Sequence, residues 1–137
     1  MRTLLTLFVL SISALYTSCR TCTLKKCSDY YELRLSGFSQ PDLDGACRIT
    51  ETGCIQIGID ASEDESYYYI TDFEVTESTP AIFYQFPATG KTYMLSNFTF
   101  DEHECNECTF GKDLYLQFSG CKVDGVSQRG NIIQLMK

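Results

Sequence analysis

The sequence predicts a small all-β domain: a disulfide-stapled, antiparallel β-sandwich or barrel. Three observations predict it. Short segments in which apolar and polar residues alternate recur about every 8–12 residues, with turn signals between them. No segment keeps a helical spacing of apolar residues for more than about two turns. The chain also has eight cysteines in 137 residues, enough to staple a small domain.

The first strand is predicted in residues 31–36, where Tyr31, Leu33 and Leu35 alternate with polar residues. A turn follows at 40–45, because a Pro and an Asp-Gly pair supply turn geometry that other residues resist. Residues 46–50 resume as a strand, and Thr52-Gly53 is the next turn. Three isoleucines, Ile55, Ile57 and Ile59, then alternate with other residues and predict one continuous strand.

Residues 61–66 are a charged loop with little to bury. A strand rich in aromatic and β-branched residues is predicted for 67–76, followed by a break at Pro80. Residues 81–86 and 91–95 form a hairpin around the turn 87–90. The remaining strand segments are a stub at Phe98 and Phe100, a strand through Leu114, Leu116 and Phe118, and a closing strand over residues 131–136.

Residues 1–18 have the pattern of a secretory signal peptide. Arg2 gives the start a positive charge, and Leu4–Tyr16 is an apolar run interrupted only by Thr and Ser. The run is too short to span a bilayer, which takes about 20 apolar residues, and no later run approaches that length. Cleavage is predicted after Ala14 or after Ser18, so we expect residues 19–137 to form a single secreted, extracellular domain.

The export signal decides how the cysteines are interpreted. An even number of cysteines in an exported chain predicts a disulfide framework rather than free thiols, and the connectivity stays open. Lipidation is an alternative to ordinary signal cleavage, because residues 16–19 resemble an imperfect bacterial lipobox. Cys19 would then be lipidated, and an odd number of cysteines would remain for disulfides. The expected disulfide cysteines are Cys19, Cys22, Cys27, Cys47, Cys54, Cys105, Cys108 and Cys121.

The formal net charge is −7, and no Lys or Arg occurs from Ile49 to Gly90. Nucleic-acid binding needs a basic patch, so it is not expected, and the same charge disfavours an anionic membrane surface. We interpret the acidic residues mainly as a solvated surface that favours solubility.

Residues 101–108 carry the only histidine, His103, beside the pair Cys105 and Cys108. A zinc site could combine these three residues with Cys19 and Cys22, but in an exported protein disulfides compete with the metal. Redox catalysis is disfavoured because the neighbouring glutamates would raise the pKa of the thiols. A lone histidine in an acidic loop is more often a surface residue than a catalytic base.

Carboxylate pairs are the remaining candidates for chemistry. Asp42 with Asp44, and Glu63 with Glu65, could serve hydrolysis or bind Ca²⁺, but the full ligand pattern of a calcium loop is missing. Asn97-Phe98-Thr99 is an N-glycosylation sequon that predicts a surface turn at Asn97. The run 67–69 consists of three tyrosines beside an acidic loop, and exposed tyrosine is enriched at recognition surfaces. Because alternation must bury one or two of the three, we attribute most of this pattern to core packing.

Taken together, these patterns predict a secreted binding or structural module, not an enzyme, with no catalytic residues, no cofactor and no metal. Its partner would be an extracellular protein or glycan. Two alternatives remain: a secreted hydrolase that uses carboxylates, and a secreted inhibitor or effector that presents a disulfide-tethered loop.

Overall fold

A computed structural model of the chain describes residues 30–104 and 114–137. The chain divides into two compact units, one made of Asp29–Asp101 with Gln117–Lys137 and the other of Met1–Ser28 with Glu102–Leu116. Of the second unit the structure describes only residues 102–104 and 114–116. The two sheets and the core belong to the first unit, apart from the ends of two strands.

The prediction of an all-β fold is confirmed, because the described residues form strands and a single short 3-10 helix. In chain order these elements are β1 (Glu32–Ser36), η2 (Gln40–Leu43), β2 (Cys47–Thr50), β3 (Gly53–Gln56), β4 (Ile59–Ala61), β5 (Tyr68–Ile70), β6 (Ile82–Phe86), β7 (Lys91–Glu104), β8 (Leu114–Val123), β9 (Val126–Arg129) and β10 (Ile132–Met136).

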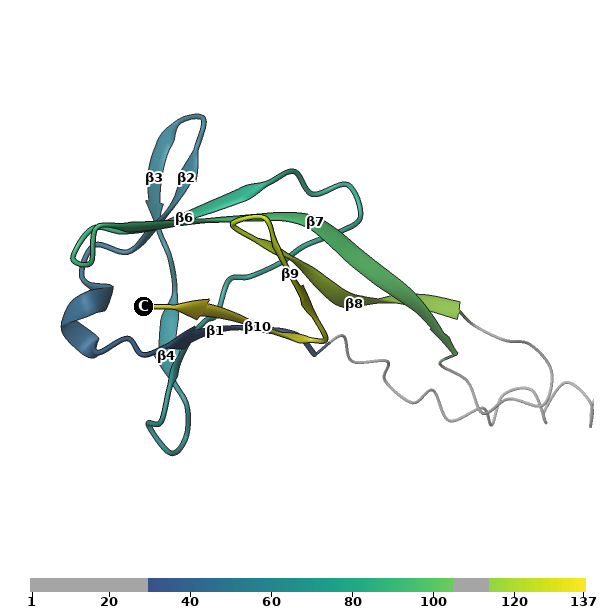
Figure 1. Cartoon of the computed structure of the whole chain (residues 1–137), viewed down its shortest axis with the longest axis horizontal. Helices are drawn as coiled ribbons and strands as arrows, with labels where there is room; N and C mark the ends of the chain where they lie inside the picture. The colour runs from purple at the N-terminus through teal and green to yellow at the C-terminus, as the bar shows by residue number, and fades with distance from the viewer. Residues whose placement is uncertain (1–29, 105–113) are drawn as a thin grey trace, which may run out of the picture. The chain divides into compact units, whose positions relative to one another are not determined.

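The strands form two sheets, and neither closes into a barrel (Figure 1). The four-stranded sheet has the order β10-β1-β5-β4, and the six-stranded sheet has the order β3-β2-β6-β7-β8-β9. One pairing departs from the antiparallel expectation: β1 and β10 run parallel, from Glu32 opposite Ile132 to Ser36 opposite Met136. The four-stranded sheet is therefore mixed, and the parallel pair joins the first described strand to the last one.

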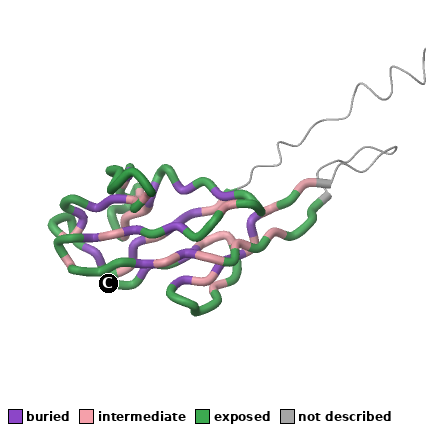
Figure 2. The backbone as a smooth tube through the Cα atoms, turned by 90° about the horizontal axis from the view of Figure 1, so that it is seen from above, coloured by how far each residue is buried: buried purple, intermediate pink, exposed green. Residues whose placement is uncertain are grey.

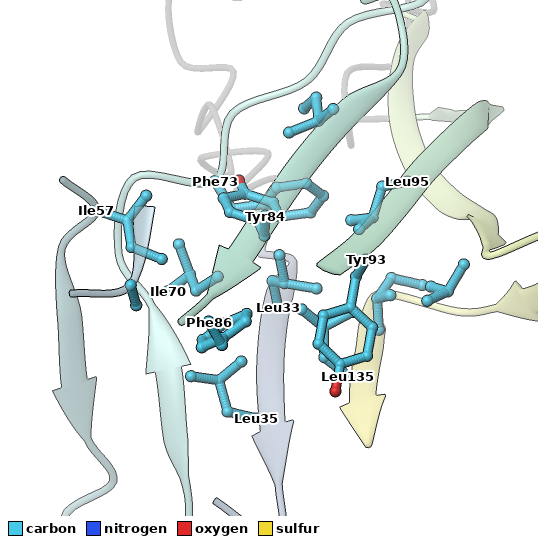
Figure 3. Packing of buried hydrophobic residues seen from close by; sticks show 14 of the residues in the cluster. Leu33, Leu35, Ile57, Ile70, Phe73, Tyr84, Phe86, Tyr93, Leu95 and Leu135 are labelled. Carbon is cyan, nitrogen blue, oxygen red and sulfur yellow. The ribbon is translucent and has the colours of Figure 1, made fainter. Parts of the chain in front are cut away.

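The core lies where side chains of the two sheets face each other (Figure 3). Leu33 and Leu35 of β1 and Leu135 of β10 are fully buried, and they belong to the same cluster as Tyr84 and Phe86 of β6. Each such side chain stabilises the fold by roughly 1.5–3 kcal/mol relative to full exposure. Figure 2 shows the resulting alternation of buried and exposed positions along the strands.

The strand predicted through Ile55, Ile57 and Ile59 is split in the structure. β3 ends at Gln56 in one sheet and β4 begins at Ile59 in the other, with Ile57 buried between them. The three side chains consequently do not share a face, since Ile55 is exposed. Alternation predicts strand conformation here but contains no signal for a change of sheet.

Two further predicted boundaries are corrected. The strand predicted for residues 67–76 ends at Ile70, and Phe73 and Val75 enter the core from irregular backbone. Conversely, β7 runs without interruption through Asn97, which was expected on a turn. Asn97 adopts a φ of 51°, so it is a local irregularity within the strand and not a connection between two strands.

The hairpin between β8 and β9 was not among the expected elements. Its two loop residues, Asp124 and Gly125, have φ values of 49° and 83°, as a type I′ turn requires. An Asp-Gly pair is a strong hairpin signal, and here it lies between Val123 and Val126, so this turn is predictable from the sequence.

A candidate binding groove on the four-stranded sheet

A groove of about 700 Å³ lies against β1, β5 and the end of β4, with the loop 62–67 as one wall. We call it the tyrosine groove. Its lining combines aromatic, hydroxyl and carboxylate side chains: Tyr30, Tyr31, Glu32, Ala61, Ser62, Glu63, Asp64, Tyr67, Tyr69, Ile70, Thr71 and Phe73.

Strand register determines which side chains reach the outer face of this sheet. Leu33 and Leu35 point into the core, so Glu32 and Arg34 point to the opposite face. Arg34 pairs with Tyr69, and Tyr69 pairs with Asp60. Because directly paired residues share a face, these three side chains form one row across β1, β5 and β4.

Glu32 is the one buried charged residue among those described, at 8% exposure, and its two oxygens are both engaged. The Tyr30 hydroxyl donates to Oε2 at 2.6 Å, and Nε of Arg34 donates to Oε1 at 2.8 Å. The hydrogen bond to Glu32 raises the pKa of the Tyr30 hydroxyl, and the corresponding bond raises the pKa of the Arg34 guanidinium. Glu32 therefore fixes the positions of both neighbours.

Arg34 also stacks on an aromatic ring, since its guanidinium carbon lies 3.8 Å from the ring centroid of Tyr67. The ring centroids of Tyr67 and Tyr69 lie 6.5 Å apart. A cation within about 6 Å of an aromatic face is attracted by the ring quadrupole. One wall of the tyrosine groove thus already holds a cation that the chain itself supplies.

The loop 62–67 is held by its own polar side chains. Oδ1 of Asp64 accepts hydrogen bonds from the hydroxyls of Ser62 and Ser66, both at 2.7 Å. Oγ of Ser62 in turn accepts from the backbone N–H groups of Ser66 and Tyr67. The hydrogen bonds from Ser66 and Ser62 lower the pKa of the Asp64 carboxyl to about 2, so the group is ionised at neutral pH.

Not every tyrosine near the groove is free to contact a ligand. The ring of Tyr31 packs edge-to-face against Phe73, with centroids 5.6 Å apart, and its hydroxyl accepts a hydrogen bond from the backbone N–H of Val75. Tyr68 packs against the core cluster. The half-buried Tyr67 and Tyr69 line the groove instead, so the run of three tyrosines is divided between core and surface.

The expected disulfide framework is only partly described. Cys47 and Cys54 form a disulfide within the β2–β3 hairpin, with Cα atoms 5.6 Å apart. Cys121 is a buried thiol without a disulfide partner among the described residues, so its expected disulfide stays a prediction. The other expected disulfide cysteines, Cys19, Cys22, Cys27, Cys105 and Cys108, lie outside the described residues.

The other residues considered for chemistry do not converge. His103 is exposed, and its ring lies 6.0 Å from that of Tyr115, while the cysteines proposed as its zinc partners lie outside the described residues. Asp42 accepts hydrogen bonds from Ser39 and from Nζ of Lys137, the latter at 2.7 Å. Within residues 30–104 and 114–137, no group of three or more His, Cys, Asp or Glu side chains is placed to hold a metal ion.

The β2–β3 hairpin forms a second exposed feature. It projects from the six-stranded sheet (Figure 1) and carries the disulfide together with Ile49 and Ile55, which are 40% and 55% exposed. Ile49 lies opposite Phe83 of β6, which is also exposed.

Comparisons of this chain with protein-family models, with curated proteins and with solved structures each find no match. Among the described residues, no helix has the length and apolar character needed to cross a membrane.

Proposed function

We propose that the protein is a secreted binding module, without a catalytic role, whose ligand occupies the tyrosine groove. The observation that carries the proposal is the groove itself, which is lined by the rings of Tyr67 and Tyr69 and by the ionised carboxylate of Asp64. Ligand sites commonly combine aromatic surface with a few polar groups that fix orientation. Strand pairing and the hydrogen bonds of loop 62–67 hold these groups in place before a ligand arrives.

The state of the carboxylates favours binding over hydrolysis. A carboxylate hydrolase needs one carboxyl group that stays protonated near neutral pH, which requires a raised pKa. The pKa of Asp64 is instead lowered to about 2, and both oxygens of Glu32 are occupied by Tyr30 and Arg34. Asp64 is therefore suited to accept a hydrogen bond from a ligand and not to donate a proton to one, whereas the oxygens of Glu32 are already used within the chain.

Export is part of the proposal, and the predicted leader and the Cys47–Cys54 disulfide support it. Asn97 is exposed, which is compatible with glycosylation of the sequon in a eukaryotic source. We expect a natively secreted sample to begin after Ala14 or Ser18 and to shift on a gel after glycosidase treatment. A cell-retained chain with its leader intact would contradict export, and an unshifted band would contradict glycosylation.

A second candidate function rests on the β2–β3 hairpin. A disulfide-bonded, projecting hairpin with exposed Ile49 and Ile55 is the kind of rigid loop that an inhibitor or effector presents to a target. In this case the binding residues would lie on the six-stranded sheet, and the tyrosine groove would not be needed.

One experiment separates the two candidates. The oxidised mature protein is tested on glycan and peptide arrays beside Tyr69→Ser in the groove, Ile55→Ser in the hairpin, and Val126→Ser as an exposed control on β9. We expect any ligand found to lose at least about tenfold in affinity with Tyr69→Ser, a change of about 1.4 kcal/mol. Loss with Ile55→Ser alone would support the hairpin instead. No ligand on either array, or binding unaffected by Tyr69→Ser, would contradict the groove proposal.

A further inference from the structure

The outer edge of β4 has backbone groups that no other described strand uses. Gly58 accepts a hydrogen bond from the N–H of Thr71, and Ser62 donates one to the carbonyl of Tyr67, both at 2.9 Å. Residues 58 and 62 therefore direct these groups toward β5. Since the direction alternates along an antiparallel strand, Ile59 and Ala61 direct their N–H and C=O groups away from β5. β4 is the last strand of its sheet in the described chain, so these groups have no strand partner there.

This free edge is continuous with the tyrosine groove. Ala61 ends β4 and also lines the groove, as do Ser62, Glu63 and Asp64, which follow it directly. Asp60 stands on the outer face of β4, in the row that continues through Tyr69 to Arg34. A segment that paired with β4 would consequently place alternate side chains beside the groove.

The negative charge at this edge decides which kind of chain segment can pair with β4. Asp60, Glu63, Asp64 and Glu65 lie within six consecutive residues, and no basic residue occurs from Ile49 to Gly90. A second copy of this chain pairing through β4 would bring two such sets of carboxylates together, and like charges across an interface disfavour that pairing. A partner segment with a basic side chain would meet complementary charge.

Arg34, which contacts two lining residues of the groove, shows how a basic side chain is held there. The guanidinium of Arg34 bonds to a carboxylate and stacks on Tyr67 at the same time. Asp64 offers a comparable partner, because Oδ1 carries its hydrogen bonds while Oδ2 has no partner among the described residues. The ring of Tyr69 supplies aromatic surface close by.

We infer that the ligand of the tyrosine groove is an extended peptide segment that adds to the free edge of β4 and places a Lys or Arg side chain beside Asp60 and Asp64. This inference rests on the proposed function and specifies its ligand class. The main-chain hydrogen bonds would come from Ile59 and Ala61, and the carboxylates and tyrosines would supply selectivity.

The test uses the isotope-labelled, oxidised mature protein and three synthetic octapeptides. The peptides share an alternating Thr-Val sequence and differ at one central position, which holds Arg, Gln or Glu. We expect the Arg peptide to bind at least about tenfold more tightly than the Glu peptide. Its binding should protect the amide hydrogens of Ile59 and Ala61 from exchange and should weaken in high salt. An Arg peptide that is N-methylated on the edge-facing residues should not bind.

Protein variants test the charge separately. Asp60→Asn and Glu63→Gln each replace an exposed carboxylate at the edge, and we expect each to weaken the Arg peptide severalfold. Glu77→Gln replaces an exposed carboxylate of the same Lys- and Arg-free segment, outside the groove, and should leave binding unchanged.

Three results would overturn the inference. One is equal binding of the Arg and Glu peptides. Another is concentration-dependent protection of Ile59 and Ala61 without any peptide, which would identify a second copy as the occupant. The third is a glycan or folded protein that needs Tyr69 but leaves those amides unprotected. This last result would still agree with the proposed function. The absence of any ligand that depends on the groove would contradict both the proposed function and this inference.

Discussion

At the residue scale, Glu32 is the charged group on which the groove depends most. A buried polar group that is left without a hydrogen-bonding partner costs about 1–3 kcal/mol of stability, because it has lost its contacts with water. Glu32→Gln keeps the shape of the side chain but has only one acceptor oxygen for Tyr30 and Arg34, so we expect it to lower the free energy of unfolding by about 1–3 kcal/mol. Urea denaturation would measure the change, with the exposed Glu77→Gln as a control. A Glu32→Gln variant as stable as its control would contradict this account of Glu32.

Asp64 makes stability depend on pH. Its pKa falls from 3.8 to about 2 in the folded protein, because Ser66 and Ser62 donate hydrogen bonds to the carboxylate. A group with a lowered folded pKa stabilises the fold above its unfolded pKa and loses that contribution as the pH falls through the folded pKa. The melting temperature should therefore decline between pH 4 and pH 2, and Asp64→Asn should decline less over the same range. Parallel curves for the two proteins would show that the Asp64 hydrogen bonds contribute nothing.

The thiol of Cys121 leads to a prediction about the number of disulfides in the protein. Burial raises the pKa of its thiol to about 11, so alkylation by iodoacetamide should be slow in the native protein and fast after unfolding without reductant. Because the chain has eight cysteines, a thiol at Cys121 leaves an odd number and at least one other cysteine outside any intramolecular disulfide. Mass spectrometry of the monomer should find no more than three disulfides. Four disulfides in the secreted protein would restore the full framework expected from the sequence.

At the element scale, the β8–β9 hairpin places its strictest demand on Gly120. This residue has a φ of +152°, and a Cβ atom there would lie 2.4 Å from the backbone carbonyl oxygen of Gln128. Backbone atoms of a paired strand cannot rotate aside, so we expect Gly120→Ala to cost about 1–3 kcal/mol of stability from the clash alone. Gly90→Ala is the matched control, since Gly90 also has a positive φ but open space around it. Equal thermal stability of the two variants would refute the close contact.

The elements also show how far the sequence predicts the fold. Short apolar segments predicted β6 and β10, although each strand also exposes an apolar residue, Phe83 in β6 and Met136 in β10. Alternation predicted β1, whose Leu33 and Leu35 share one buried face. It failed where tertiary contacts decide the boundary. At Gly58 a Cβ atom would lie 2.2 Å from Oγ1 of Thr71, and this close approach accompanies the change of sheet that separates β3 from β4. Such a contact joins residues distant in sequence and leaves no local pattern.

The candidate site was even less accessible from the sequence. The tyrosines at 67–69 and the acidic loop stand out in the sequence, but acidic residues of this kind most often form a solvated surface. Glu32 and Arg34 attracted no attention, because each looks like an ordinary polar residue of a half-buried strand. Their role follows from the register that sets Arg34 beside Tyr69, and register depends on the long-range pairing of β1 with β5.

At the scale of the whole molecule, the question is whether the disulfide or the core holds the described fold together. The Cys47–Cys54 bridge spans a sequence separation of only 7 and stays within one hairpin. The core cluster, in contrast, takes buried side chains from both sheets. Closing a loop this short stabilises a protein by roughly 2–3 kcal/mol, a minority of a typical total of about 5–15 kcal/mol.

We therefore expect a double variant, Cys47→Ala with Cys54→Ala, to remain folded and to lose roughly 2–3 kcal/mol of unfolding free energy, because the variant removes a constraint on the unfolded chain and leaves the core in place. Denaturant unfolding would give the loss, and the near-ultraviolet signal of the buried tyrosines would report native packing. Core truncation provides the comparison: Leu33→Ala removes a fully buried side chain and should cost about 2–5 kcal/mol. If the double variant unfolded while Leu33→Ala stayed native, the disulfide and not the core would be the principal stabiliser of this fold.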